Sequence, residues 1–388
     1  MVTANKRNKA TFKRITSFIL TAIMIFGVLT IMPNTEMKVS AENTNYNGFI
    51  APIDPIPDGV NVKHISTAED LAQIGGTGSK NNYYVLDNDI DLKDYGEWTP
   101  IVDFGGIFDG RGHTIHNLTI TQLSYKRTNG YYCIGLFATT TVNGTSLKPT
   151  NSIIKNLAVN INKFSLEITN NNTGFTVEIG GIVGYVSNSD IINCYVTGQN
   201  INIESVGNTN GPSYTIGGLL GNVPGSASIT NCYSTIDINV NSNFNSKIGG
   251  LIGESYSPVI NCFTTGNIYN RYSGQYIGGL IGNALNTVSN CYATGNVTSI
   301  DGFAVYAGGL VGATGTRNIE NCYATGNVVA SSVSSVCQAG GISGSSSGSM
   351  INCYALGDVS SVLINYPNHN QFKSNAGGLS GRPLTVCG

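Results

Sequence analysis

Charged residues are scarce in this 388-residue sequence, which has 20 Lys and Arg, 22 Asp and Glu, and four His. A mildly acidic chain with so few cations lacks the basic surface that nucleic acids require, so nucleic acid is not an expected partner. None of the histidines (His64, His113, His116 and His369) is followed by Glu, which excludes the H-E-x-x-H motif of helical zinc peptidases. The nine cysteines also lack the two-to-four-residue spacing of zinc ligands. We therefore expect no metal and no other cofactor.

Long apolar runs are also missing, except at the amino terminus. There a basic stretch from Lys6 to Arg14 precedes a mostly apolar segment, residues 15–32, and Val39-Ser40-Ala41 forms a small-residue cleavage site. This order is typical of a secretory signal peptide, here over residues 1–41, and predicts a secreted or cell-surface protein. An uncleaved membrane anchor is the alternative, because the apolar segment is long for a signal peptide.

What the sequence does contain is a repeated phrase: an apolar residue, any residue, Asn, and then a short core-like run. Its steps range from 29 to 39 residues. The eight Asn residues are Asn117, Asn156, Asn193, Asn231, Asn261, Asn290, Asn321 and Asn352. A second phrase, I-G-G-L-I-G or a near variant, recurs at 179–184, 216–221, 248–253, 277–282, 307–312, 339–344 and 376–381. A period this regular indicates stacked structural repeats.

The residue types within each repeat predict an all-β fold. The repeats are rich in Val, Ile, Thr and Tyr, are punctuated by Gly and Asn, and are too short for a pair of helices. We expect a right-handed parallel β-helix (solenoid) with coils of roughly 30 residues, in which each strand pairs with its equivalents about 4.8 Å above and below. Ser66 and Glu69 form a capping-box pattern, which predicts a short helix that covers the first coil.

Substitutions at the repeated positions indicate which side chains point inward. The residue after Asn is Leu in the first two copies and Cys in the other six, which is typical of a buried apolar site. We expect a buried column of Cys194, Cys232, Cys262, Cys291, Cys322 and Cys353. Free thiols are favoured over disulfides, because in-register parallel strands aim both Cβ atoms the same way. Asn is placed at a corner with a left-handed backbone, where the amides of successive coils form a structural ladder.

An aromatic residue follows two positions after six of these Asn residues, with the opposite parity to the Cys column and therefore pointing outward. The six residues are Tyr195, Tyr233, Phe263, Tyr292, Tyr323 and Tyr354. They form a candidate binding stripe for sugar rings or a partner surface. The alternative is that the rings stack on one another and only stabilise the outer face.

Acidic residues do not form an evident active site. Across 179–388 they are sparse and do not share one repeat position, whereas acid–base chemistry needs paired groups on one face. We therefore predict no catalytic residue. The run from Asp87 to Asp91 resembles a calcium loop only in part, since the Gly turn and distal Glu are missing, and solvated strand ends are favoured. The spacing of His113 and His116 does not suit a metal site on a strand.

The phrases G-G-L-I-G (278–282) and N-C-Y-A-T-G-N-V (290–297 and 321–328) resemble the GLUG repeat of bacterial surface proteins. The segment 105–120, G-G-I-F-D-G-R-G-H-T-I-H-N-L-T-I, is similar to the start of the same β-helical regions. Such regions occur in adhesins and in front of the catalytic domain of immunoglobulin A-specific zinc metallopeptidases. The resemblance implies a β-helix at an external surface and carries no catalytic residue into this chain. The expected organisation is a signal peptide (1–41), a linker (42–61), a cap with the first coils (62–120) and GLUG-type repeats (121–388).

We expect a non-catalytic surface protein that binds host glycans or glycoproteins, so that carbohydrate or a host surface protein is its partner. The alternative is a spacer, or the amino-terminal fragment of a larger wall protein or metallopeptidase. The last G-G-L-S-G phrase (377–381) has no N-C-Y phrase after it. The open carboxy-terminal edge is therefore a further place where another chain could dock.

Overall fold

The computed structural model describes residues 55–381 apart from positions 57, 80–81, 125–126, 128–129, 141–151, 169–174, 206–211, 273 and 365–373. The predicted signal peptide, most of the predicted linker, His369 and Cys387 lie outside the described residues. Within the described part, no helix is long and apolar enough to cross a membrane.

The described chain is a parallel β-helix, as predicted, because every pairing between its strands is parallel and joins equivalent segments of successive coils. The first of its three sheets contains β1 (Asn61–Ile65), β2 (Asn82–Leu86), β4 (Ile107–Asp109), β8 (Ser152–Lys155), β12 (Ser189–Ile192), β17 (Ile229–Thr230), β22 (Val259–Ile260), β27 (Val288–Ser289), β31 (Ile319–Glu320) and β35 (Met350–Ile351). The smallest contains β7 (Phe137–Thr139), β11 (Val183–Tyr185), β16 (Leu220–Val223), β21 (Ile252–Ser255), β26 (Ile281–Ala284), β30 (Val311–Thr314) and β34 (Ser343–Ser345).

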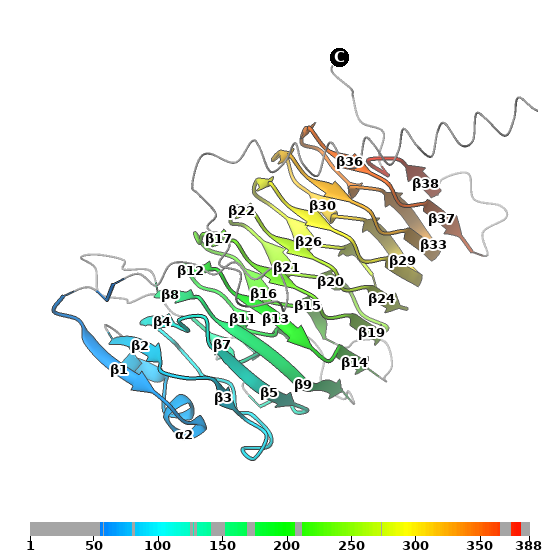
Figure 1. Ribbon diagram of the computed structural model, residues 1–388. Coiled ribbons are helices and arrows are strands. Elements are labelled where there is room, and N and C mark those ends of the chain that lie inside the picture. The colour runs from blue at the N-terminus through cyan, green and yellow to red at the C-terminus, as the bar shows by residue number, and fades with distance from the viewer. Residues whose placement is uncertain are drawn as a thin grey trace, which may run out of the picture. The chain divides into compact units, whose positions relative to one another are not determined.

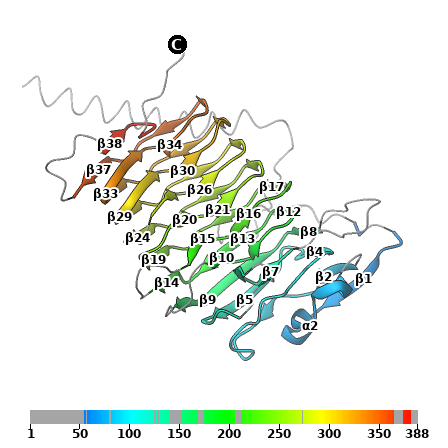
Figure 2. The same cartoon turned by 180° about the vertical axis from the view of Figure 1, so that it is seen from behind.

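The largest sheet runs through the remaining part of each coil. After the Asn corner come β13 (Tyr195–Gly198), β18 (Tyr233–Ser234), β23 (Phe263–Thr264), β28 (Tyr292–Ala293), β32 (Tyr323–Ala324) and β36 (Tyr354–Ala355). Next come β14 (Ile201–Ser205), β19 (Ile238–Ser242), β24 (Ile268–Arg271), β29 (Val297–Gly308), β33 (Val328–Gly340) and β37 (Val359–Leu363). The last strands of this sheet in each coil, which we call the returning strands, are β6 (Tyr132–Ile134), β10 (Thr176–Gly180), β15 (Ser213–Gly217), β20 (Ser246–Gly249), β25 (Tyr276–Gly278) and β38 (Ser374–Gly377). The first coils add β3 (Ile90–Asp91), β5 (Thr114–Ile120) and β9 (Ala158–Glu167). The strands of successive coils lie side by side from β5 and β9 to β33 and β37 (Figure 1), and the reverse view shows the same order (Figure 2).

A short helix, α2 (Ala68–Ala72), lies near the first coils and is followed by a 3-10 turn (Gly76–Ser79). Its N-cap is Thr67 rather than the predicted Ser66, and its capping box closes with Asp70 rather than Glu69. The Asp70 amide donates to Thr67 Oγ1 (3.1 Å), and the Thr67 amide donates to Asp70 Oδ2 (3.0 Å). Both pairs fit the sequence pattern of a capping box, so the pattern alone could not fix the first residue of the helix.

The repeated Asn residues occupy left-handed corners. All eight have φ between 53° and 62°, a region that Asn enters more easily than other non-glycine residues. From Asn193 to Asn352, each side-chain Nδ2 donates to Oδ1 of the Asn one coil earlier, at 3.0–3.2 Å. Asn156 ends this ladder by donating to Asp109 Oδ1 at 3.0 Å. The corner thus joins neighbouring coils through side chains as well as through the backbone.

Asn117 does not belong to the ladder, so the predicted register of the first copy was wrong. The strand before Asn156 is β8, and its partner in the previous coil is β4, with Asp109 opposite Lys155. Asn117 lies further along the coil in β5, where Ile115 pairs with Val159. It donates to Asp91 Oδ1 at 2.7 Å. The phrase at 115–120 therefore resembles the later copies in letters but occupies a different strand.

The Cys column lies inside the solenoid. Cys194, Cys232, Cys262, Cys291 and Cys322 are at most 1% exposed, whereas Cys353 in the last described N-C-Y copy is partly exposed. These six thiols are free, and each donates to the carbonyl two residues earlier at 3.1–3.3 Å. Burial raises the pKa of Cys194, Cys262 and Cys291, so these thiols stay protonated.

The Gly-Gly pair of the second phrase marks a corner where two coils approach closely. A Cβ atom on Gly250 would lie 2.2 Å from the carbonyl oxygen of Gly279, and one on Gly279 would lie 2.1 Å from that of Gly309. Both obstacles are backbone atoms, which cannot rotate away. The sequence repeats Gly here because any side chain would separate the coils.

We predict that the two functions of the ladder Asn can be separated at Asn261, which donates to Asn231 and accepts from Asn290. Asn261→Gly keeps the left-handed corner but removes the amide bonds, and should lower the free energy of unfolding by about 1–2 kcal/mol. Asn261→Ala also forces Ala into the left-handed region, which costs about 1–2 kcal/mol more. Urea denaturation of both variants measures the difference. A glycine variant that is no more stable than the alanine variant would contradict this explanation of the corner.

Candidate functional site

The six aromatic residues of the candidate stripe form one continuous stack. Their ring centroids are 4.6–5.1 Å apart, and adjacent ring planes differ by 3–7°. The strand register explains this geometry, because Tyr233 pairs with Phe263, Phe263 with Tyr292, and Tyr292 with Tyr323. In-register pairing places the same side chain of each coil directly above the previous one.

Stacking determines which part of each ring can meet a ligand. Each ring inside the row covers the faces of its neighbours, so only ring edges and hydroxyl groups are left for solvent or a partner. Tyr233 is only 5% exposed, and burial raises the pKa of Tyr233 and Tyr323. A pyranose ring cannot lie flat on a ring within this row. The geometry therefore fits the alternative in which the stack stabilises the outer face.

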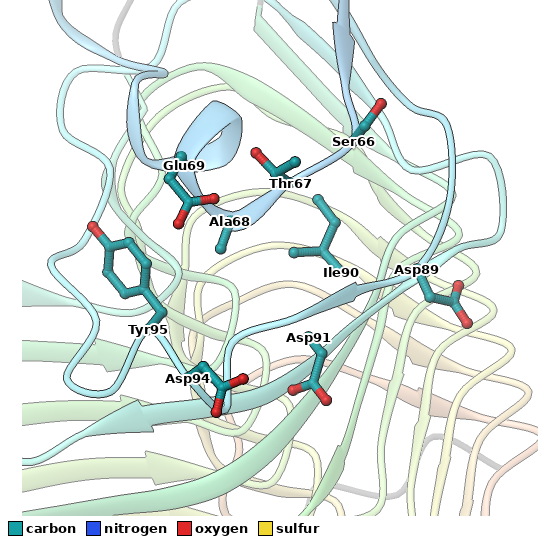
Figure 3. Close-up of a pocket in the computed structure, with 9 residues that line it drawn as sticks. All are labelled: Ser66, Thr67, Ala68, Glu69, Asp89, Ile90, Asp91, Asp94 and Tyr95. Carbon is teal, nitrogen blue, oxygen red and sulfur yellow. The ribbon is translucent and has the colours of Figure 1, made fainter.

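A pocket of about 300 Å³ lies beside α2 and β3 (Figure 3). Ser66, Thr67, Ala68, Glu69, Asp89, Ile90, Asp91, Asp94 and Tyr95 line it. In the close-up, Glu69 and Tyr95 lie on the same side of the pocket, and Asp94 and Asp91 lie along its lower edge. The pocket brings Asp89 and Asp91, which were predicted to be solvated strand ends, together with Glu69 and Asp94.

The acidic run beside this pocket connects neighbouring coils. Asp87 Oδ1 lies 2.8 Å from His64 Nδ1, and Asp89 Oδ1 accepts from the Thr114 amide (2.9 Å) and lies 3.1 Å from His113 Nδ1. The hydrogen bond from Asn117 holds the pKa of Asp91 below its ordinary value. Over the described ranges, no group of three His, Cys, Asp or Glu side chains is arranged to hold a metal ion. The run therefore has a visible structural use as a set of acceptors between coils.

A buried polar cluster that the sequence analysis missed surrounds Glu178 on β10. Glu178 is fully buried although it alternates with the core residues Val177 and Ile179. Its carboxylate accepts from Asn222 Nδ2 at 2.8 Å and from Cys133 Sγ at 3.3 Å. The repeats did not indicate a buried acidic residue here, because the equivalent positions of the next two coils hold Thr215 and Lys247.

Charged neighbours extend this cluster across the Gly-Gly corner. The Arg127 guanidinium lies 3.8 Å above the Tyr185 ring. One coil beyond Asn222 on the same sheet, Glu254 forms an ion pair with Lys247 at 2.6 Å and accepts from Asn283 at 2.7 Å.

Desolvation raises the pKa of Glu178 to about 7, and burial also raises the pKa of Cys133. A carboxyl group with a pKa near 7 suits proton transfer, but Glu178 is inaccessible to a substrate. The thiol of Cys133 is likewise buried and protonated, so it is a poor nucleophile. We therefore interpret the cluster as structural.

Comparison with known proteins identifies the repeats. The family model described as "The GLUG motif" matches residues 176–202, 212–239, 273–298 and 303–329. Each match runs from a returning strand through the Gly-Gly corner and the Asn corner to the strand after the aromatic residue. The chain therefore contains GLUG motif repeats, which confirms the resemblance found in the sequence.

Two further comparisons give less detail. A crystal structure of a proposed immunoglobulin A1 protease from Bacteroides ovatus is similar, with 21% sequence identity and a TM-score of 0.44. The similarity covers 82% of this chain and 83% of that protein. No curated protein sequence matches the chain significantly.

We predict that Glu178 makes stability depend on pH. Its pKa rises from an ordinary 4.5 to about 7 on folding, so the folded chain holds a proton that the unfolded chain releases. The contribution of Glu178 to the free energy of unfolding should therefore be greatest below pH 4.5. It should fall by up to about 3 kcal/mol as the pH rises from 4.5 through 7.

Urea denaturation of Glu178→Gln between pH 4.5 and 8 tests this dependence, because the variant has no proton to lose. Glu204→Gln is the matched control, since Glu204 is exposed on β14 and accepts from Asn241 at 2.8 Å. The control should keep the wild-type dependence on pH. An unchanged dependence in Glu178→Gln would show that Glu178 is not its source.

Proposed function

We propose that this chain is an exported surface protein whose β-helix binds carbohydrate or glycoprotein and has no catalytic activity of its own. The signal-like order of residues 1–41 supports export. Its partners would be glycans, or proteins that carry them, on a host surface. We propose that it needs no cofactor and does not bind nucleic acid.

The interactions of the repeated residues with one another support a scaffold role for these residues, with ligand binding at other positions. Within the described coils, the Asn residues bond to one another, the thiols fill the interior and the aromatic rings cover one another. Side chains that are already used in this way are poorly placed to recognise a ligand. Recognition would therefore fall to residues that differ between coils, as is common for repeat proteins.

One observation carries the binding role: large aromatic side chains are exposed at positions outside the repeated phrases. Tyr269 is 41% exposed, Tyr272 is 37% exposed and Phe303 is 59% exposed. Aromatic side chains combine apolar area with low conformational entropy, which makes them effective contact residues. A spacer would gain little from keeping three such groups in water.

A spacer is the second candidate, because the stack, the ladder and the thiol column are all explained by stability alone. This role includes the case in which the β-helix supports another domain of a larger wall protein or metallopeptidase. It predicts no ligand for the β-helix itself.

A glycan array combined with immobilised host glycoproteins separates the two functions. We expect the purified exported chain to be retained reproducibly by a subset of the glycans. Tyr323→Ser, which removes one ring from inside the stack, should lower the melting temperature without changing which glycans are retained. If the wild-type chain is retained by no glycan or glycoprotein, the binding role is wrong and the spacer is favoured.

A further inference from the structure

Exposed aromatic residues lie on or directly after two strands of adjacent coils, β24 and β29, which lie side by side (Figure 1). Tyr269 lies within β24, Tyr272 directly follows this strand, and Phe303 lies within β29. The register places Arg271 opposite Ile300, and the Tyr272 amide donates to the Ile300 carbonyl at 3.0 Å. We call Tyr269, Tyr272 and Phe303, together with Arg271 and Asp301, the aromatic corner.

The aromatic corner differs from the stack in how much of each side chain meets solvent. Tyr269, Tyr272 and Phe303 are 41%, 37% and 59% exposed, whereas the rings of the stack are buried or only partly exposed. The difference follows from position. Stack residues recur at one register position, but Tyr269 pairs with Asn239 in the coil before and with Thr298 in the coil after.

Hydrogen-bonding groups lie next to these rings. Arg271 Nε is 3.4 Å from Asp301 Oδ2, and the Arg271 guanidinium lies 4.5 Å from the centre of the Tyr272 ring. The Asp301 amide donates to Ser331 Oγ at 3.0 Å, which fixes the backbone of that residue. The side chains of Arg271 and Asp301 are 43% and 27% exposed, so both are accessible to a ligand. Donors and acceptors are therefore held beside apolar ring surface.

The backbone of the corner is unusual. Tyr272 has φ 66° and Asp301, its equivalent in the next coil, has φ 60°. A bulky residue in the left-handed region costs about 1–2 kcal/mol relative to Gly, and Asn would occupy it more easily. Such strain is retained most often where the resulting side-chain position is used. Here the left-handed backbone sets the direction of the Tyr272 side chain at the end of β24.

We propose that the aromatic corner is a carbohydrate subsite, in which a pyranose ring lies against exposed aromatic surface while Arg271 and Asp301 bond its hydroxyl groups. A sugar presents an apolar C–H face and a rim of hydroxyl donors and acceptors, which matches this combination of groups. This inference rests on the proposed function and assigns it a site.

Two other classes of partner fit the corner less well. The ion pair interrupts the apolar surface, whereas a stable protein interface needs about 800 Å² from each partner with a continuous apolar centre. Nucleic acid would require several cations, and Arg271 is already neutralised by Asp301.

Binding to the array-selected oligosaccharide, measured by titration calorimetry, tests the site. The double variant Tyr272→Asn/Phe303→Ser removes two rings, and Asn is the residue that best tolerates the backbone angle of Tyr272. We expect its affinity to fall by at least about tenfold, with an unchanged circular dichroism spectrum and a melting temperature no lower than that of the wild-type chain, because Asn relieves the backbone strain at this position. Tyr256→Ser is the matched control, because Tyr256 lies outside the corner and, at 48%, is more exposed than either tyrosine of the corner. It should keep wild-type affinity.

The outcomes distinguish this inference from the proposed function. If the wild-type chain binds and the double variant binds equally well, the corner is not the site, although the proposed function stands. An equal loss of affinity in Tyr256→Ser would also overturn the assignment. A wild-type chain that is retained by no glycan would remove the proposed function itself.

Discussion

The structure depends on the in-register parallel pairing of successive coils. A strand such as β23 or β28 has only two residues and finds its backbone partners in the coils on either side. Pairing at constant register places each repeated residue directly over its counterpart. The amide ladder, the thiol column and the aromatic stack are three consequences of this one constraint. Each involves a different chemical group, and each recurs because the register does not change between the coils that contain it.

The same constraint separates structural from variable residues. A residue that recurs at one position is covered by its copies above and below, as Phe263 is by Tyr233 and Tyr292. A residue without such copies keeps more of its surface in water, as Tyr269 does between Asn239 and Thr298. Two aromatic groups of similar composition therefore have different uses. The stack contributes to stability, and the aromatic corner has surface available for a ligand.

Much of the fold could be predicted from the repeats, because the residue types found at one position of several coils indicate the burial and backbone conformation of that position. Exchange of Leu and Cys at one position indicated burial, and Asn between two strands of conflicting parity indicated a left-handed corner. The first coils were harder to predict. The phrase around Asn117 matches the later copies in its letters, but it lies on a different strand of the coil from theirs. The helix start was shifted by one residue because two overlapping capping patterns compete.

The candidate sites were less predictable, for a physical reason. Glu178 is buried by contacts with Cys133 and Asn222, which are far away in the sequence and belong to different coils. The aromatic corner likewise joins residues of two coils whose relative register only the structure provides. The direction of the stripe could be predicted from parity, but whether its rings would meet a ligand or one another depended on the stacking distance.

Selective labelling of the thiols tests the in-register stack most directly. The chain can be treated with iodoacetamide before and after unfolding in guanidinium, and the modified cysteines located by mass spectrometry. We expect that only unfolding makes the five buried cysteines reactive, since all five are at most 1% exposed: Cys194, Cys232, Cys262, Cys291 and Cys322. Modification of these five residues in the folded chain at the rate of an exposed thiol would contradict a dry column of stacked coils.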